Sequence, residues 1–230
     1  MRQIKTFSDT RLDGMCSYCG NYPDTRDHVP SKIFLDEPYP ENLPVVPCCD
    51  QCNQSFSLDE EYIACFLECV LCGSTEIDKL KKVKIKRILL SKEPLRQRIK
   101  KSQIKSEDEI VFKVDTRRLE NVLVKLAKGH AKYENSEPVL EEPKKIMYSP
   151  LITMEQNEID LFFADAELLK LPEVGSRAMQ NLVIENNIGF SHWTVVQPDN
   201  YSYCVTMNFG RLSVRILIWD YIAAEIVWEE

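Results

Sequence analysis

The sequence lacks a long apolar run. Glu68 interrupts the first strongly apolar segment, and Asp220 and Glu225 interrupt the last one, so no stretch of about 18 uncharged apolar residues is available to span a bilayer. The opening residues, MRQIKTFSDTRLDG, also lack the apolar core of a signal peptide. These absences predict a soluble, cytoplasmic protein that has no membrane partner.

Positive charge is scarce in the chain as a whole. The 230 residues include 29 Lys+Arg and 36 Asp+Glu, a net charge of −7, which argues against a protein that coats nucleic acid through bulk charge. The deficit is uneven, because residues 79–105 carry 12 basic residues and one acidic residue, a net charge of +11. Such a segment can follow a phosphate backbone, although a solvated amphipathic helix would have the same composition. The candidate nucleic-acid-binding residues in it are Lys81, Lys82, Lys84, Lys86 and Arg87.

The chain has no internal repeat and no low-complexity tract, and 44% of its residues are hydrophobic, so it can bury a core. Its pattern predicts an α+β fold in three segments. Residues 1–73 are loop-rich and end in a helix from about Ser57 to Gly73, residues 74–145 are mainly helical, and residues 146–230 are β-rich. The other predicted elements are helix over 75–101 with a break at Pro94, a strand over 109–115, a helix over 116–133, and strands over 192–197, 201–208 and 211–219.

Cysteine is abundant, with nine residues, and cysteines in a cytoplasmic protein bind metal more often than they form disulfides. Cys16-x-x-Cys19 and Cys49-x-x-Cys52 form two pairs that can close a tetrahedral zinc site. Four thiolates leave no open position, so this zinc would be structural and would staple the 29 residues between the pairs. The cysteines expected in other roles are Cys48, an alternative ligand, and the core residues Cys65, Cys69, Cys72 and Cys204.

The segment between the two cysteine pairs, together with the residue that follows the second pair, contains the residue types that a metal-dependent phosphodiesterase uses. Asp27 and His28 precede Pro30, Asn42 lies further along, and Asn53 follows the last cysteine directly. A hard cation such as Mg²⁺ prefers carboxylate and amide oxygens, while a neutral imidazole can take a proton from water near pH 7. Because neighbours on a strand point to opposite faces, Asp27 and His28 can share a site only where the strand ends, and Pro30 marks such an end.

The combination of C-x2-C, DH-x-P, a central Asn and C-x2-C-N resembles the HNH endonuclease family, in its stand-alone bacterial, zinc-stapled ββα-metal form, over residues 15–62. The resemblance implies an N-terminal module in which a β-hairpin and a helix hold one divalent cation, Mg²⁺ or Mn²⁺. It implies that His28 is the general base, that Asp27 and Asn53 bind the catalytic cation, and that Asn42 orients the hairpin. The structural zinc would be held by Cys16, Cys19, Cys49 and Cys52.

The resemblance also implies hydrolysis of DNA phosphodiester bonds, in a bacterial or phage setting where such nucleases often serve defence. This chain departs from many members at residues 31–34, where SKIF replaces a Gly-rich turn; Lys32 there could touch phosphate or stay solvated. The alternative is a catalytically inactive HNH-like module that binds nucleic acid or a protein partner. RNA as the substrate, a regulatory protein partner and a homo-oligomer paired through the final strand stay open. His130 and His192 have no motif partner; His130, beside Gly129 near a predicted helix end, could cap carbonyl groups there.

Overall fold

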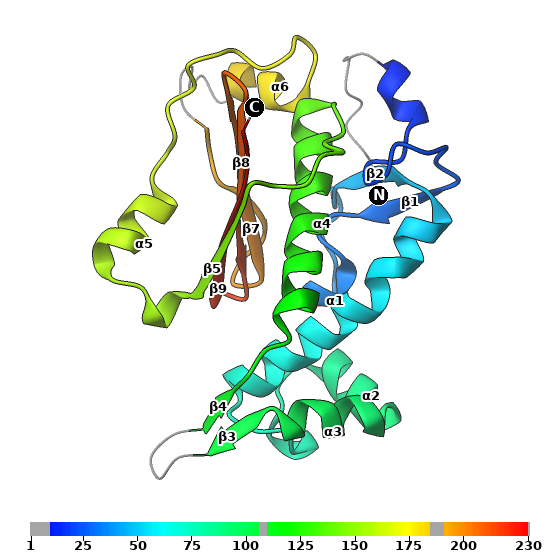
Figure 1. The fold of residues 1–230 in the computed structure, drawn as a ribbon, viewed down its shortest axis with the longest axis vertical. Helices are drawn as coiled ribbons and strands as arrows, with labels where there is room; N and C mark the ends of the chain where they lie inside the picture. Colours follow the sequence, from blue (N-terminus) through cyan, green and yellow to red (C-terminus); the bar gives the residue numbers. More distant parts are fainter. Residues whose placement is uncertain (1–9, 106–109, 185–190, 230) are drawn as a thin grey trace. The chain divides into compact units, whose positions relative to one another are not determined.

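The computed structural model describes residues 10–105, 110–184 and 191–229, and these form a mixture of helices and antiparallel sheets (Figure 1). The helices are α1 (Asp50–Leu71), α2 (Val83–Ser91), α3 (Glu93–Lys101), α4 (Thr116–Asn135), α5 (Gln156–Phe163) and α6 (Arg177–Ile184). The strands are β1 (Thr25–His28), β2 (Val45–Cys48), β3 (Gln103–Lys105), β4 (Ile110–Phe112), β5 (Lys145–Pro150), β6 (Thr194–Gln197), β7 (Tyr201–Asn208), β8 (Arg211–Ile218) and β9 (Ile222–Glu229). The α+β class is therefore confirmed.

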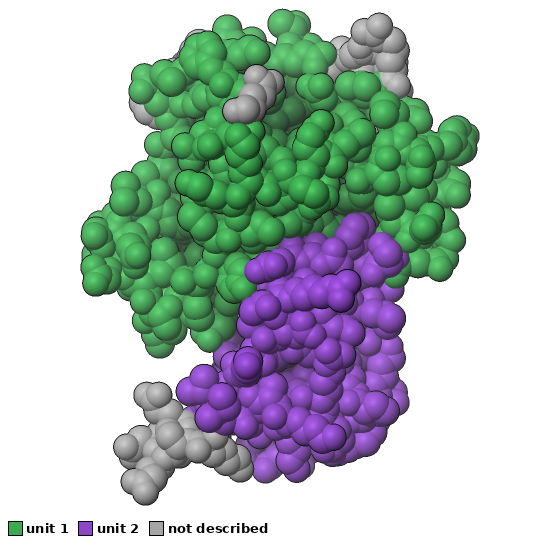
Figure 2. All heavy atoms as spheres, in the orientation of Figure 1, with its two compact units in different colours: residues 1–54, 123–230 green, residues 55–122 purple. Residues whose placement is uncertain are grey.

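The chain divides into two compact units, coloured separately in Figure 2. The first unit contains the described residues of 1–54 and 123–230, and the second contains those of 55–122. The units do not follow the segments 1–73, 74–145 and 146–230 that composition suggested. Helices α1 and α4 each contribute residues to both units, which is a division that local sequence patterns do not reveal.

A five-stranded antiparallel sheet with the order β5-β9-β8-β7-β6 dominates the first unit. The alternating segments 201–208 and 211–219 form β7 and β8 as predicted, and the turn between them places Phe209 and Gly210 at positive φ angles of 37° and 80°. Strand β9, which was not among the predicted strands, pairs with β8 along its full length. The β-rich C-terminal region is confirmed.

The part of α4 that belongs to the first unit lies between this sheet and the β1–β2 hairpin (Figure 1). On the sheet side, the His130 ring stacks on Tyr203 with centroids 3.7 Å apart, and its Nε2 lies 2.8 Å from the Tyr201 hydroxyl. His130 is fully buried, and this burial holds its pKa well below the ordinary value. The suggested capping role of His130 is wrong, because the residue faces the sheet.

The loop between β1 and β2 is fastened to the same sheet. Trp219 Nε1 donates to the carbonyl oxygen of Phe34 at 2.8 Å, and the two rings meet edge to face. The backbone N–H of Asp36 donates to Gln197 Oε1 at 2.8 Å, and Asn200 Nδ2 donates to the Asp36 carboxylate at 3.1 Å. The C-terminal sheet therefore holds the loop that leads out of β1.

The second unit contains α2, α3, the β3–β4 hairpin and most of α1. Helices α2 and α3 are separated at Lys92, and Pro94 lies in the first turn of α3, where its missing N–H breaks no helical bond. The predicted helix over 75–101 is wrong before Val83, because the Glu68 carboxylate accepts the backbone N–H groups of Lys81 and Lys82 ahead of α2.

The cysteine stripe on α1 packs in the interior of this second unit. Cys65 and Cys69 are buried, which confirms their expected packing role, whereas Cys72, directly after α1, is half-buried with its thiol 3.5 Å from Glu68 Oε1. The predicted strand over 109–115 is shorter, from Ile110 to Phe112, and residue 109 lies outside the described residues. No helix in the described ranges combines the length and apolarity that crossing a membrane needs.

Candidate metal centre and its surroundings

Strands β1 and β2 form a short antiparallel hairpin, and α1 follows β2 almost directly. Asp27 pairs with Val46 and His28 pairs with Val45. His28 is the last residue of β1. Helix α1 begins at Asp50 and not near Ser57, because the Asp24 carboxylate accepts the Asp50 backbone N–H at 2.6 Å and stabilises the helix start from across the hairpin.

The four predicted zinc ligands come together where this hairpin meets α1. The Sγ atoms of Cys16, Cys19, Cys49 and Cys52 all lie within 4.8 Å of one another, and those of Cys19 and Cys49 are 3.7 Å apart. Tetrahedral thiolates with Zn–S bonds of about 2.3 Å would be about 3.8 Å apart, so the cluster could bind a metal such as zinc. Cys48 is buried, and its thiol donates a hydrogen bond to the Cys49 carbonyl oxygen. It is not one of the four cysteines of the cluster.

The thiols of this cluster differ in acidity. Burial acts to raise the pKa of Cys16, but backbone N–H groups of Cys49, Tyr18 and Cys19 outweigh burial and bring the pKa to about 7. Burial raises the pKa of Cys19 and of Cys52. A metal must therefore displace protons from thiols that hold them at neutral pH, so its binding weakens as pH falls.

Asp27 is buried and has two close partners. Its Oδ2 accepts a hydrogen bond from the Tyr18 hydroxyl at 2.6 Å and lies 2.6 Å from Nζ of Lys125, on α4. Among the described residues, no hydrogen bond reaches the other carboxylate oxygen, Oδ1. Asp27 can therefore offer Oδ1 to a ligand while Oδ2 stays fixed.

His28 is half-buried, and its surroundings hold its pKa below 6.5. Burial is the main cause, and the positive charge of Lys32 adds to it. The Asp27 charge acts in the opposite direction, and the charge of Lys125 lowers the pKa further. The imidazole is therefore neutral at pH 7 and can accept a proton.

Asn53 lies in the first turn of α1 and reaches β1. Its Nδ2 is 3.4 Å from Thr25 Oγ1, which leaves the amide oxygen for another ligand. Thr25 and Asp27 are two apart on β1, so their side chains point to the same face of the hairpin. Asn53 therefore contacts a residue on the face of β1 that also carries Asp27, and carboxylate and amide oxygens are ligands that hard divalent cations prefer.

Asn42 is exposed in the turn that precedes β2. Within the described ranges its side chain makes no hydrogen bond, so the structure does not link it to Asp27, His28 or Asn53. Its proposed orienting role stays a prediction.

The predicted nucleic-acid-binding residues lie in two places. Lys32 lies in the loop between β1 and β2, with Nζ 5.4 Å from the centre of the Tyr39 ring. In the second unit, Lys81 and Arg87 are exposed, while Lys82, Lys84 and Lys86 are half-buried. Ion pairs with acidic residues outside the basic segment reduce its effective charge, namely Lys79–Glu76, Lys92–Glu61 and Arg98–Asp115.

Sequence reasoning missed the contribution of α4 to this site. Lys125, Lys128 and Lys132 are all buried, at spacings of three and four residues on one face of the helix. A signal was present, because these lysines continue the stripe of buried residues that includes Leu119 and Val122. Lysines on an amphipathic helix usually face solvent, and no local pattern identifies the acidic partner of a buried one.

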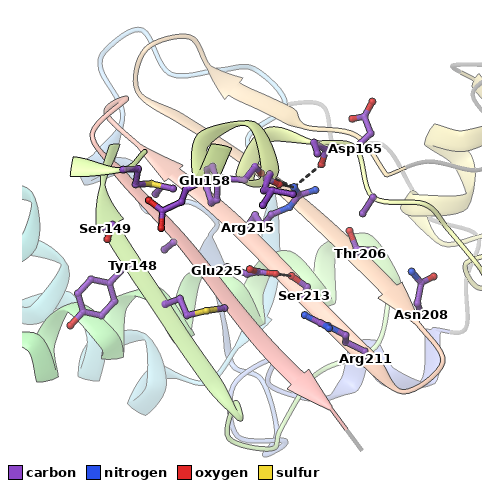
Figure 3. Close-up of a pocket in the computed structure, with 18 of the residues that line it drawn as sticks. Tyr148, Ser149, Glu158, Asp165, Thr206, Asn208, Arg211, Ser213, Arg215 and Glu225 are labelled. Atoms are coloured by element: carbon purple, nitrogen blue, oxygen red, sulfur yellow. Dashed lines mark hydrogen bonds between the residues drawn. The ribbon is translucent and has the colours of Figure 1, made fainter. Parts of the chain in front are cut away.

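The C-terminal sheet carries a separate hollow of about 910 Å³, beneath α5 and on the sheet face opposite α4 (Figure 3). Arg211, Ser213, Arg215 and Glu225 point into its floor, and Ser213 Oγ donates to Glu225 at 2.6 Å. The lining mixes charges of both signs with neutral polar groups. This mixed lining does not indicate one class of ligand.

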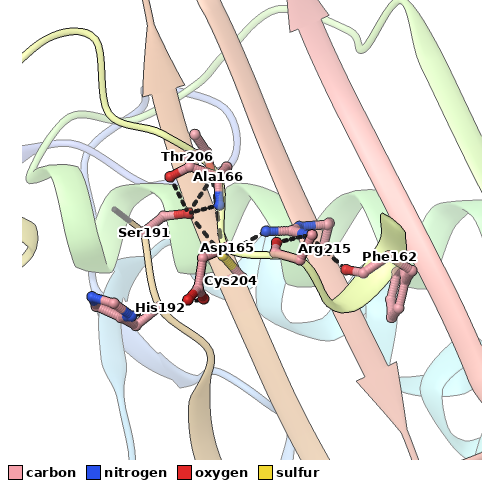
Figure 4. A network of polar contacts seen from close by, with 9 residues as sticks. Phe162, Asp165, Ala166, Ser191, His192, Cys204, Thr206 and Arg215 are labelled. Carbon is pink, nitrogen blue, oxygen red and sulfur yellow. Dashed lines mark hydrogen bonds and ion pairs between the residues drawn. The ribbon is translucent and has the colours of Figure 1, made fainter. Parts of the chain in front are cut away.

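A polar network joins this hollow to the segment after α5 (Figure 4). Arg215 donates to the carbonyl oxygens of Phe162 and Ala164 at 2.6 and 2.7 Å and to Cys204 Sγ at 3.3 Å. Thr206 Oγ1 donates to Ser191 Oγ at 3.0 Å. The network satisfies the end of α5 and ties it to β7 and β8, which is a structural role; Cys204 is buried there, as expected.

Comparison with protein-family models, with curated proteins and with solved structures found no match for this chain.

Proposed function

We propose that this protein is a divalent-cation-dependent endonuclease of the HNH type, which hydrolyses DNA phosphodiester bonds at a site formed by Asp27, His28 and Asn53. The observation that supports the proposal is that Asn53 Nδ2 lies 3.4 Å from Thr25 Oγ1, and Thr25 is two residues from Asp27 on the same face of β1. The cysteine cluster supports it, because it joins the hairpin to the start of α1.

Each residue has a chemical role in the proposal. His28, neutral at pH 7, takes a proton from the attacking water. Asp27 Oδ1 and the Asn53 amide oxygen hold Mg²⁺ or Mn²⁺. The cation would neutralise charge on the scissile phosphate and the leaving oxygen.

The other parts of the chain have supporting roles. Zinc on the four cysteines fixes the hairpin against α1, and the basic residues of 79–105 attract the phosphate backbone without reading sequence. A cellular nuclease must be restrained, so we expect a regulatory protein partner, in a defence or mobile-element setting.

The proposal is tested by cleavage of supercoiled plasmid DNA by the zinc-loaded protein in Mg²⁺, in Mn²⁺ and in EDTA. Cleavage should require the divalent cation, and Asn53→Ala should lower it by about tenfold or more at subsaturating cation, because one ligand is lost. Asn157→Ala is the matched control, since Asn157 is an exposed asparagine in the first turn of α5. Cleavage that survives EDTA, or an Asn53→Ala protein that cuts at the parental rate, would contradict the proposal.

The second candidate is a catalytically inactive module that binds nucleic acid. The ammonium group of Lys125, 2.6 Å from Asp27 Oδ2, favours it, because that group occupies one oxygen of the proposed cation ligand. This reading predicts a DNA mobility shift that is insensitive to EDTA and to Asp27→Asn, with no cleavage in any divalent cation.

A further inference from the structure

Lys125 is a buried lysine whose charge is matched by Asp27. Its side chain is 1% exposed and that of Asp27 is 10% exposed, and Nζ lies 2.6 Å from Oδ2. The Tyr18 hydroxyl donates to the same oxygen at 2.6 Å, and Nζ lies 5.9 Å from the centre of the Tyr18 ring. A buried lysine is costly unless it is paired, so this contact holds α4 and the hairpin in one arrangement.

The backbone of α4 supports the contact one turn further on. A Cβ atom at Gly129 would lie 2.6 and 2.9 Å from the two methyl carbons of Val29, and 3.2 Å from the Tyr18 hydroxyl. Only glycine lets the helix approach the end of β1 this closely. Lys125 therefore reaches Asp27 from a helix that is pressed against the same segment.

This arrangement leaves Asp27 with two unequal oxygens. Oδ2 is held by a cation and a hydroxyl, while Oδ1 has no hydrogen bond among the described residues. A divalent cation that approaches Oδ1 meets a carboxylate whose charge is already balanced by an ammonium group. Coulomb repulsion from that group weakens cation binding, and the fixed Oδ2 prevents the carboxylate from turning to use both oxygens.

We propose that Lys125 is a positioning residue for a divalent-cation site at Asp27: with Tyr18 it holds Oδ2, so that Asp27 presents Oδ1 alone and binds Mg²⁺ or Mn²⁺ through one oxygen. This inference rests on the cation site of the proposed function, and it assigns part of that site to α4. The cation is consequently held weakly and in one place, at the side of the hairpin that Asn53 also reaches.

The test measures Mn²⁺ binding to the zinc-loaded full chain by titration calorimetry, without DNA. Lys125→Met should bind Mn²⁺ about tenfold more tightly, because the repelling charge and the hold on Oδ2 are both removed. Its cleavage rate at saturating Mn²⁺ should fall, because the cation is no longer held in one position. Lys125→Arg keeps the charge and should retain the parental affinity.

Lys128→Met is the matched control. Lys128 is a buried lysine on the same helix, with Nζ 3.3 Å from Glu142 Oε1 and 3.2 Å from the Leu140 carbonyl oxygen. Its loss should lower thermal stability and leave Mn²⁺ affinity unchanged. A purely structural role for Lys125 predicts the same of Lys125→Met, so a folded Lys125→Met protein with the parental affinity would overturn the inference.

If Lys125→Met does not fold, Tyr18→Phe decides the question. That variant removes only the hydroxyl that donates to Oδ2 and should tighten Mn²⁺ binding by about twofold or more; unchanged affinity overturns the inference.

Asp27→Asn separates the two proposals. If it binds Mn²⁺ as tightly as the parent does, Asp27 is not a ligand and the inference fails. If the parent binds Mn²⁺ through Asp27 but never cuts DNA, the proposed nuclease function fails and the role of Lys125 stands.

Discussion

At the scale of single residues, the acidity of His28 connects the local structure with the proposed chemistry. Burial and the charges of Lys32 and Lys125 lower its pKa, and the neighbouring Asp27 offsets them only in part. A histidine in such a place loses its proton more readily than a free histidine does. It is therefore suited to accept a proton from water at a pH where a free histidine is already partly protonated.

This acidity predicts the pH dependence of cleavage. A lowered pKa means that the neutral form persists to lower pH than in a free histidine, so the half-point of the acid limb of kcat/KM should lie below pH 6.5, the ordinary histidine pKa. The profile should be measured with a small phosphodiester substrate at saturating Mn²⁺. Lys32→Met removes one of the charges that lower the pKa, so its acid limb should move to higher pH. A parental half-point at or above pH 6.5, or no movement in Lys32→Met, would refute this account of His28.

At the scale of elements, the close approach of α4 to β1 joins two stretches of chain that lie far apart in sequence. Glycine inside a helix usually destabilises it relative to alanine, so Gly129 costs stability locally. The contact with Val29 and Tyr18 explains its presence, because a larger residue would push the helix away.

Gly129→Ala should therefore destabilise the protein, against the usual sign of a glycine-to-alanine change in a helix. We expect a loss of about 1–2 kcal/mol in the free energy of unfolding, because overpacking against Val29 outweighs the gain in helix propensity. Gly14→Ala is the control, since a Cβ atom there would have nothing within 4 Å, and it should change stability by less than about 0.5 kcal/mol. Denaturant unfolding of the zinc-loaded proteins measures both. A Gly129→Ala protein at least as stable as the parent would show that the approach is not tight.

At the scale of the whole molecule, the sequence allowed the prediction of features that depend on local spacing. The two C-x-x-C pairs identified the cysteine cluster because four thiolates at that spacing have few other uses, and alternation identified β7 and β8. The start of α1 was missed, because its cap is the Asp24 carboxylate on the other side of the hairpin.

Other features of the molecule depend on pairs that only the folded chain brings together. The ion pair of Lys125 with Asp27 joins residues almost a hundred positions apart, and the bond from Trp219 to the loop at Phe34 spans a still longer separation. Neither contact produces a periodic pattern in the sequence. The sequence therefore indicated candidate site residues on the hairpin, but not the contacts with α4 and the C-terminal sheet that hold the hairpin in place. The net charge of +11 in residues 79–105 likewise overstated the available positive charge, since several of these residues pair with acidic neighbours.

In the proposed function, His28 activates water for cation-dependent cleavage of DNA. This role is tested most directly by comparing parental protein and His28→Ala, both zinc-loaded and equally folded by thermal unfolding, in the cleavage of plasmid DNA with Mn²⁺. We expect His28→Ala to keep its zinc and its unfolding temperature but to cut about 10²- to 10⁴-fold more slowly. A His28→Ala protein that cuts at the parental rate would contradict this role.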